Sequence, residues 1–172
     1  MITSNLEANW KEFKVKDVFN IERPSARKKT DYNDGLIPFV ASGNYNNGVE
    51  RYVTQLLNEH LDKENCITVS PLTGTAYYQD KPFLGRGGAG SSILILRNEN
   101  LNYNRGLFIC TIISKVCQKY SYEDMGNQKR LENESIWLPC LSGNEIDWDF
   151  MDSYIAALKI GIESKIAIIK SI

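Results

Sequence analysis

The segment from Asp147 to the end of the chain constrains the fold most, because its apolar residues recur at helical intervals. These residues, spaced by three or four, are Met151, Ile155, Leu158, Ile162, Ile166 and Ile169. Such spacing places one apolar stripe on an α-helix. An acidic first turn precedes the stripe, and Asp147 or Asp149 is expected to cap it. At about 1.5 Å per residue, positions 151–172 would form a helix roughly 33 Å long.

Two placements of this helix are open. It can fold back onto its own domain, or it can leave the domain and pair with a partner. The heptad-like spacing, and a pattern that stops without a C-cap, favour the partner-binding placement. We therefore expect a domain over residues 1–146 and a separate helix over residues 147–172.

The rest of the sequence predicts an α+β fold rich in β-strand. Short β-branched or aromatic runs lie between polar loops. The predicted strands are 36–41, 49–53, 66–70, 91–96 and 136–139, with a short strand or helical turn over 10–19. The apolar run 106–116 fits a strand or a buried helix, and its length favours a helix.

Composition indicates one globular unit without a membrane span. The 172 residues are 42% hydrophobic, which is enough for a core. The longest apolar run is far below the roughly 20 residues that cross a bilayer. Cys66, Cys110, Cys117 and Cys140 lack the close pairing of a zinc site, so we expect reduced, buried thiols in a cytoplasmic protein.

The net charge of −1 conceals an alternation of basic and acidic blocks. Residues 1–30 carry seven Lys and Arg against four Asp and Glu, and residues 81–130 carry eight against three. Residues 31–80 carry two against seven, and residues 131–172 carry three against seven. If the two basic blocks converge, the protein presents a cationic face suited to a polyanion; otherwise the charges are merely solvated.

Motifs for catalysis or nucleotide binding are weak. Gly85, Gly87 and Gly90 match the spacing of a dinucleotide-binding turn, but a strand is predicted after them where that turn needs a helix. The segment suits either a plain hairpin turn or a backbone lying close to an anion. His60 has no nucleophile or metal ligands nearby in the sequence and is expected to be exposed. We expect no metal and no cofactor.

The loops are rich in side chains of the kinds that DNA-binding proteins use. Asn and Gln bind adenine edges, whereas Arg and Lys bind guanine or phosphates. The candidates for phosphates are Arg23, Arg27, Lys28, Lys29, Arg86, Lys119, Lys129 and Arg130, and those for base edges are Asn44, Asn46, Asn47, Thr73, Tyr77 and Tyr78. Loops of unrelated proteins are also rich in such residues, so composition alone does not settle the function.

An ordered series of segments resembles the specificity subunits of type I-like restriction-modification systems. The segments are Trp10-Lys-Glu-Phe-Lys-Val-Lys-Asp-Val-Phe, Ile37-Pro-Phe-Val-Ala-Ser with Asn47-Gly-Val, Ile67-Thr-Val-Ser, Leu101-Asn-Tyr-Asn-Arg-Gly-Leu-Phe, Lys119-Tyr-Ser-Tyr, Ile136-Trp-Leu-Pro and Ile146-Asp-Trp-Asp-Phe-Met-Asp-Ser-Tyr-Ile. The series spans nearly the whole chain. Each segment alone is a loose match to the family, whereas the complete series in this order is fairly specific for it.

The resemblance implies a target-recognition domain followed by a conserved helix, which is half of a full subunit. It implies binding to double-stranded DNA, docking to a DNA adenine methyltransferase subunit and possibly a restriction subunit, and a homodimer formed through the last helix. It implies no catalysis by this chain, since methylation and cleavage belong to other subunits. Two rival hypotheses are a protein-interaction module that binds no DNA, and a small nuclease or hydrolase whose site the sequence does not reveal.

Overall fold

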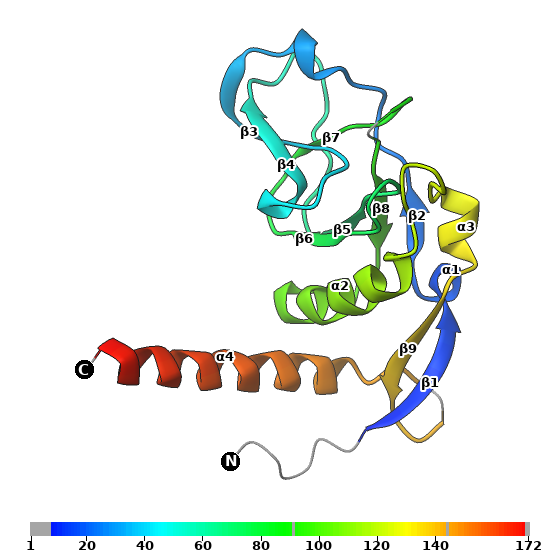
Figure 1. Ribbon diagram of the computed structural model, residues 1–172, viewed down its shortest axis with the longest axis vertical. Coiled ribbons are helices and arrows are strands. Elements are labelled where there is room, and N and C mark those ends of the chain that lie inside the picture. The colour runs from blue at the N-terminus through cyan, green and yellow to red at the C-terminus, as the bar shows by residue number, and fades with distance from the viewer. Residues whose placement is uncertain (1–7, 91, 144, 171–172) are drawn as a thin grey trace.

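The computed structural model describes residues 8–90, 92–143 and 145–170, and the fold is α+β, as the sequence predicts (Figure 1). Two of the three small sheets lie above a pair of helices, and the third, a two-stranded ribbon, runs beside that pair. The strands are β1 Asn9–Lys14, β2 Asn20–Glu22, β3 Asp34–Val40, β4 Val49–Val53, β5 Cys66–Val69, β6 Ala76–Gln79, β7 Leu84–Gly85, β8 Leu94–Arg97 and β9 Ser135–Cys140. The helices are α1 Val15–Val18, η1 Lys29–Asp31, η2 Asn46–Gly48, α2 Tyr103–Cys117, α3 Gln128–Glu132 and α4 Trp148–Lys170.

The central sheet has the order β2-β8-β5-β6, with antiparallel neighbours, and α2 packs against it. Every residue of β5 is buried, which confirms the predicted buried strand. Asn102 caps α2 by accepting a hydrogen bond from the backbone N–H of Arg105 over 2.9 Å. A helix therefore forms over the ambiguous run 106–116.

A second sheet, β4-β3-β7, forms the upper part of the domain with its own small core. Phe39, Val53 and Leu84 are fully buried there. The predicted strands 36–41 and 49–53 correspond to β3 and β4. The predicted strand 91–96 begins later, as β8, and Ser91 lies outside the described residues.

A two-stranded ribbon of β1 and β9 links the domain to α4. The ring of Trp10 stacks on Phe108 of α2 at a centroid distance of 6.2 Å, and it meets Phe150 of α4 edge-on at 6.3 Å. The ribbon and both helices thus share one aromatic cluster, which fixes the direction in which α4 leaves the ribbon.

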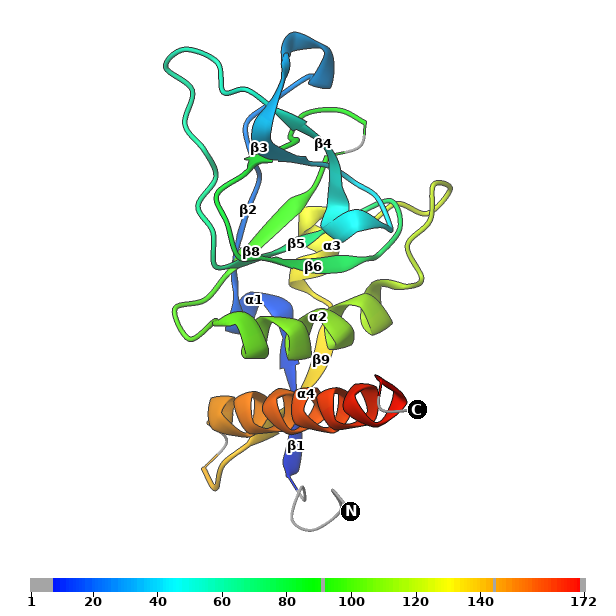
Figure 2. The same ribbon diagram turned by 90° about the vertical axis from the view of Figure 1, so that its left-hand side faces the viewer.

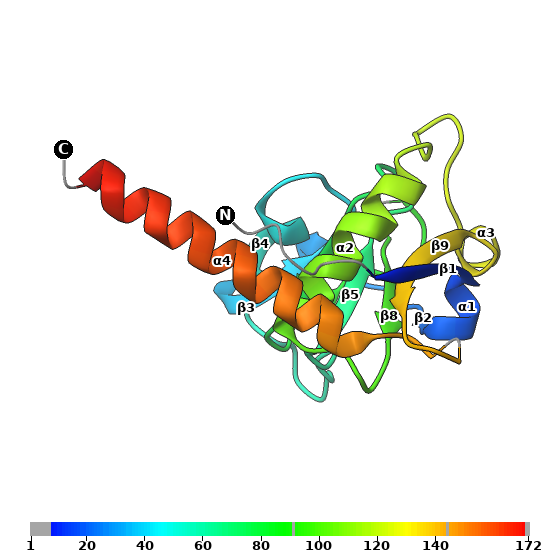
Figure 3. The same ribbon diagram turned by 90° about the horizontal axis from the view of Figure 1, so that it is seen from below.

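The helix α4 begins as the sequence predicts, because Asp147 accepts a hydrogen bond from the N–H of Phe150 over 2.8 Å. Its first turns pack on α2, and its far end extends past the rest of the domain (Figure 3). Met151 is fully buried and Ile155 packs against the same core. The assignment of Met151 to a partner surface is therefore wrong, since the protein's own core covers that side chain.

The second half of α4 leaves apolar side chains in solvent. Leu158, Ile162 and Ile166 are 43%, 57% and 45% exposed, and Ile169 is also exposed. The helix combines the two placements that the sequence left open: its start folds back on the domain, and its continuation offers an uncovered stripe.

Two further expectations concern cysteines and membranes. The four cysteines are buried and unpaired with one another, as expected for thiols in a core. Within the described parts of the chain, no helix combines the length and apolarity that crossing a bilayer requires.

Candidate nucleic-acid interface

The two basic blocks of the sequence meet in space. Arg23, in the first block, donates from Nε to Oε1 of Gln128 in the second, over 3.0 Å. The backbone N–H of Gly87 donates to the carbonyl of Ser25 over 2.9 Å. The basic loop after β2 and the glycine-rich segment after β7 therefore lie side by side, as a cationic face requires.

Four loops join this contact into one surface, which we call the loop surface: residues 42–48, residues 70–75, residues 86–90 with Ser92, and residues 118–127. Ser42 Oγ donates to the carbonyl of Ser92 over 2.6 Å, and Thr75 Oγ1 donates to that of Gly43 over 2.6 Å. The N–H of Gly126 donates to the carbonyl of Pro71 over 2.8 Å. These loops gather on the right-hand side of Figure 2, opposite the connection 54–65.

A groove of about 310 Å³ runs between the glycine-rich segment and the start of α3. The side chains of Arg23 and Gln128 and the backbone of Gly87 and Gly88 line this groove. Its apolar lining includes Leu72 and Met125, and its polar lining includes the Arg23 guanidinium, the amides of Asn127 and Gln128, and glycine backbone. That is the chemistry that accepts a phosphate or sugar.

The glycines of this segment are needed for packing. A Cβ on Gly87 would lie 2.0 Å from the carbonyl oxygen of Pro24, which no side chain tolerates. Gly88 and Gly90 have φ of +84° and +86°, in the left-handed region that favours glycine. The strand β8 follows rather than a helix, as predicted, so the segment lacks the helix N-terminus of a dinucleotide-binding turn.

Arg27 is not available to phosphates, and its assignment as a phosphate contact is wrong. It is 7% exposed and hydrogen-bonds Glu59 Oε1 and Asp62 Oδ2, each over 2.7 Å. It also donates to the carbonyls of Gly85 and His60. Partners 32 to 58 positions away hold this cation inside the domain, where it joins β7 to the connection 54–65.

The other predicted cations differ in how far they are already paired. Arg23, Lys28 and Lys129 are exposed, and Arg86 is half-buried in the glycine-rich segment. Lys29 pairs with Glu50, and Lys119 with Glu134, yet each lysine side chain remains about half exposed.

Arg130 is engaged by an internal network. Its guanidinium makes two hydrogen bonds to Asp124, of 2.6 and 3.0 Å, and lies 4.8 Å from the centre of the Tyr120 ring. These hydrogen bonds hold the pKa of Asp124 below its usual value. Tyr120 in turn donates to the buried carboxylate of Glu134. In this structure Arg130 stabilises the loop 118–127, and its side chain stays 30% exposed.

The predicted base-edge residues fall into two groups. Asn44, Asn46 and Asn47 are exposed at the tip of the loop 42–48, whereas Thr73 and Tyr77 are half-buried below it. Tyr78 is in the core: its ring packs on Gly106 of α2, and its hydroxyl donates to Asn65 over 2.8 Å. The assignment of Tyr78 to a base edge is wrong, because neighbouring residues on a strand face opposite sides and Tyr78 faces α2.

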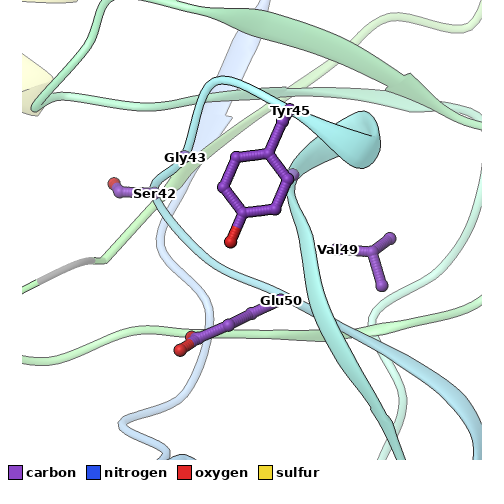
Figure 4. Close-up of a pocket in the computed structure, with 6 residues that line it drawn as sticks. Ser42, Gly43, Tyr45, Val49 and Glu50 are labelled. Atoms are coloured by element: carbon purple, nitrogen blue, oxygen red, sulfur yellow. The ribbon is translucent and has the colours of Figure 1, made fainter.

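The loop surface also contains a small pocket that the sequence-based list missed. Ser42, Tyr45, Val49 and Glu50 line it, with the ring of Tyr45 standing over the opening (Figure 4). Tyr45 is 66% exposed. An exposed aromatic in a polar loop was visible in the sequence. Glu50 carried no such signal, since acidic residues are not expected in a DNA interface.

Two expectations from the sequence concern His60 and metal ligands. His60 is exposed, as predicted, and its side chain has no role in the Arg27 network. Over residues 8–90, 92–143 and 145–170, no three His, Cys, Asp or Glu side chains are grouped as metal ligands.

Comparison with known proteins agrees with this geometry. Residues 7–168 match the family of type I restriction modification DNA specificity domains. The specificity subunit S.BcgI of a type II restriction enzyme from Heyndrickxia coagulans is 26% identical over 153 residues, which cover 89% of this chain and 44% of that subunit.

Solved structures share the fold at low identity. The S subunit of a type I restriction-modification system from M. genitalium matches with a TM-score of 0.58 and 13% identity over 94% of this chain. The HsdS subunit from Thermoanaerobacter tengcongensis matches with a TM-score of 0.58 and 15% identity over 95% of this chain. The chain spans 44% and 41% of the lengths of those two subunits.

The family match covers nearly all of the chain, and the fold is that of solved S subunits. The chain belongs to the type I restriction modification DNA specificity domain family, and it corresponds in length to less than half of the relatives that it matches.

Proposed function

We propose that this chain is a target-recognition unit that reads double-stranded DNA for a restriction-modification complex and catalyses nothing itself. The observation that carries the proposal is the convergence of the two basic blocks, through the Arg23–Gln128 and Gly87–Ser25 contacts, on one side of the domain. A cationic surface built from several loops suits the phosphate backbone and the groove edges of a duplex.

The proposed contacts follow exposure. Cations that remain accessible would hold phosphates, and polar side chains at the loop tips would meet base edges. The proposed phosphate contacts are Arg23, Lys28, Lys29, Arg86, Lys119 and Lys129, and the proposed base contacts are Asn44, Asn46, Asn47, Thr73 and Tyr77.

We further propose that α4 mediates assembly. Leu158, Ile162 and Ile166 form an exposed apolar stripe, which a second copy of α4 or a methyltransferase subunit would cover. Because the chain spans less than half of its relatives, a homodimer through this stripe would restore two recognition units. Such a dimer would read an inverted repeat with a fixed gap.

The exposed stripe also favours a second candidate, a protein-interaction module that binds no DNA. This candidate uses the same helix but assigns no role to the loop surface. It predicts no binding to nucleic acid that depends on salt, whereas the recognition unit predicts affinity that falls steeply as salt rises.

The test is co-purification of this chain with the adenine methyltransferase subunit encoded beside its gene, followed by selection of bound molecules from random duplex DNA. Recognition predicts an enriched short motif. No enrichment, with or without the methyltransferase subunit, would favour the protein-interaction module.

Lys129→Ala separates DNA contact from assembly. Because Lys129 is exposed on α3, directly after the groove residue Gln128, its loss should weaken binding to all sequences and reduce the slope of log affinity against log salt by about 1. Lys63→Ala is the matched control, since Lys63 is exposed in the connection 54–65 on the opposite side. Equal effects of the two substitutions would contradict the proposed interface.

A further inference from the structure

A carboxylate, that of Glu50, lies at the edge of the loop surface beside the cation Lys29. Glu50, the second residue of β4, lines the pocket beneath Tyr45, and its carboxylate points toward the same opening as the Tyr45 hydroxyl (Figure 4). The pocket has a volume of about 120 Å³. This volume is several times the roughly 10–15 Å³ that holds one water molecule, so a small polar group such as an amino group fits in it.

The backbone that presents Tyr45 is held rigidly. Asn46 and Asn47 adopt φ of +47° and +55°, a left-handed pair that makes the sharp turn after Tyr45. Nδ2 of Asn47 donates to the carbonyl of Tyr78 over 3.1 Å, and the buried Gln79 donates back to the carbonyl of Asn47 over 3.1 Å. Binding at the pocket therefore does not require this turn to be ordered first.

The other end of the loop is anchored as firmly. Thr75 Oγ1 donates to the carbonyl of Gly43, and Ser42 Oγ donates to that of Ser92, each over 2.6 Å. The pocket is thus a preformed concavity between two fixed points of the loop surface.

Glu50 keeps one carboxylate oxygen free within the described residues. Lys29 donates to Oε1, whereas Oε2 has no hydrogen-bond partner among residues 8–90, 92–143 and 145–170. An ionised carboxylate accepts hydrogen bonds and donates none, so it repels phosphates. The groups on a DNA duplex that attract it are amino donors on base edges, N4 of cytosine and N6 of adenine.

We propose that the pocket of Glu50 and Tyr45 is a specificity site that reads an exocyclic amino group, on cytosine or adenine, at one position of the target. The inference rests on the proposed DNA-reading function. Glu50 Oε2 accepts the amino hydrogen, Tyr45 contacts the same base from above, and Lys29 holds the carboxylate while its exposed amine faces the adjacent phosphate.

The test starts from the motif that the wild-type chain enriches from random duplex DNA. At each position where the motif requires dA or dC, that base is replaced by deoxynebularine or by 2-pyrimidinone deoxyriboside, which lack the amino group. At one position, the wild-type chain should lose affinity by about tenfold or more on this replacement. Glu50→Ala should bind the two duplexes equally, and its own selected motif should lose the base preference at that position alone.

Two variants control for indirect effects. Glu64→Ala removes an exposed acid from the connection 54–65 and should keep the complete motif. Tyr45→Phe keeps the ring that contacts the base and should retain the discrimination that Glu50→Ala loses. Thermal unfolding of each variant checks that the domain is intact, since surface substitutions of this kind change stability little.

The outcomes separate this inference from the proposed function. A wild-type motif that Glu50→Ala leaves unchanged, with uniformly tighter binding, would show that Glu50 only neutralises Lys29, and it would overturn the inference alone. No wild-type motif at all would overturn the proposed function and the inference together.

Discussion

Arg27 Nη1 donates a hydrogen bond to Asp62 Oδ2 over 2.7 Å, although 35 positions separate the two residues. Asp62 Oδ2 also accepts from the N–H of Gly85 over 2.8 Å. The pair therefore fixes the start of the glycine-rich segment to the connection 54–65. A sequence-based reading places Arg27 on the surface, but the cation has become part of the scaffold that carries the interface.

Replacing Arg27 by Met should destabilise the domain strongly. The substitution leaves the mostly buried carboxylates of Glu59 and Asp62 without the cation that they share. Breaking a buried ion pair in this way costs about 3–5 kcal/mol in the free energy of unfolding. Urea denaturation measures this cost. Arg23→Met, at an exposed position, should change the free energy by less than about 0.5 kcal/mol, and equal effects of both changes would refute the structural role.

The same cluster should make stability depend on pH through Glu59. Burial alone would raise the pKa of Glu59, but hydrogen bonds from Arg27 and Tyr32 outweigh it and lower that pKa. In the unfolded chain the pKa of a glutamate is about 4.3. The stability that Glu59 contributes is therefore complete above that value and is lost as pH falls through the lower, folded-state pKa.

Glu59→Gln tests this dependence. The variant should be less stable than the wild type at neutral pH, and the difference should shrink as the solution is acidified below about pH 4.3. Urea midpoints measured from pH 7 to pH 2 give the two curves. Parallel curves over that range would exclude Glu59 as the titrating group.

Gly87→Ala should separate the two basic segments. Its Cβ would lie 2.0 Å from the carbonyl oxygen of Pro24, so the backbone must move. Overpacking of this kind costs about 1–3 kcal/mol. DNA affinity should also fall, because Arg23 and the groove lie at the same contact. Gly43→Ala is the control, since a Cβ there meets no atom within 4 Å; thermal unfolding and DNA titration compare the two.

The two halves of α4 should respond differently to substitution. Met151→Ala removes a fully buried side chain and should cost about 2–5 kcal/mol in stability. Ile162→Asp alters a side chain that is 57% exposed, so the domain should stay folded while the proposed homodimer dissociates. Sedimentation velocity and thermal unfolding measure the two effects, and a wild-type chain that sediments as a monomer without its partner would remove the homodimer from the proposal.

Local patterns predicted most of the elements. β5 follows from a run of β-branched residues, α2 from a long apolar run, and α4 from its spacing and its cap at Asp147. These features depend on neighbours within a few positions, which a sequence displays directly.

The site could be predicted only in part, because burial depends on distant partners. Arg27 and Arg130 look alike in the sequence, since each lies within a basic run. In the structure Arg27 is buried and hydrogen-bonded to Asp62, whereas Arg130 is hydrogen-bonded to Asp124. Tyr77 and Tyr78 are adjacent, and only the register of β6 against α2 shows that Tyr78 lies in the core. Glu50 was not predicted as a site residue because its position next to Lys29 and under Tyr45 is visible only in the folded structure.

The hydrogen bonds that hold the loop surface together end mostly on backbone carbonyls. The carbonyl oxygens that accept these hydrogen bonds belong to Gly43, Pro71, Tyr78 and Ser92. A backbone carbonyl is present whichever side chain the position carries. Side chains at the tip, such as Asn44 and Tyr45, can therefore be exchanged without removing an anchor. The anchors of the loop surface are therefore separate from its exposed tip, so the side chains at the tip can vary in evolution while the fold stays the same.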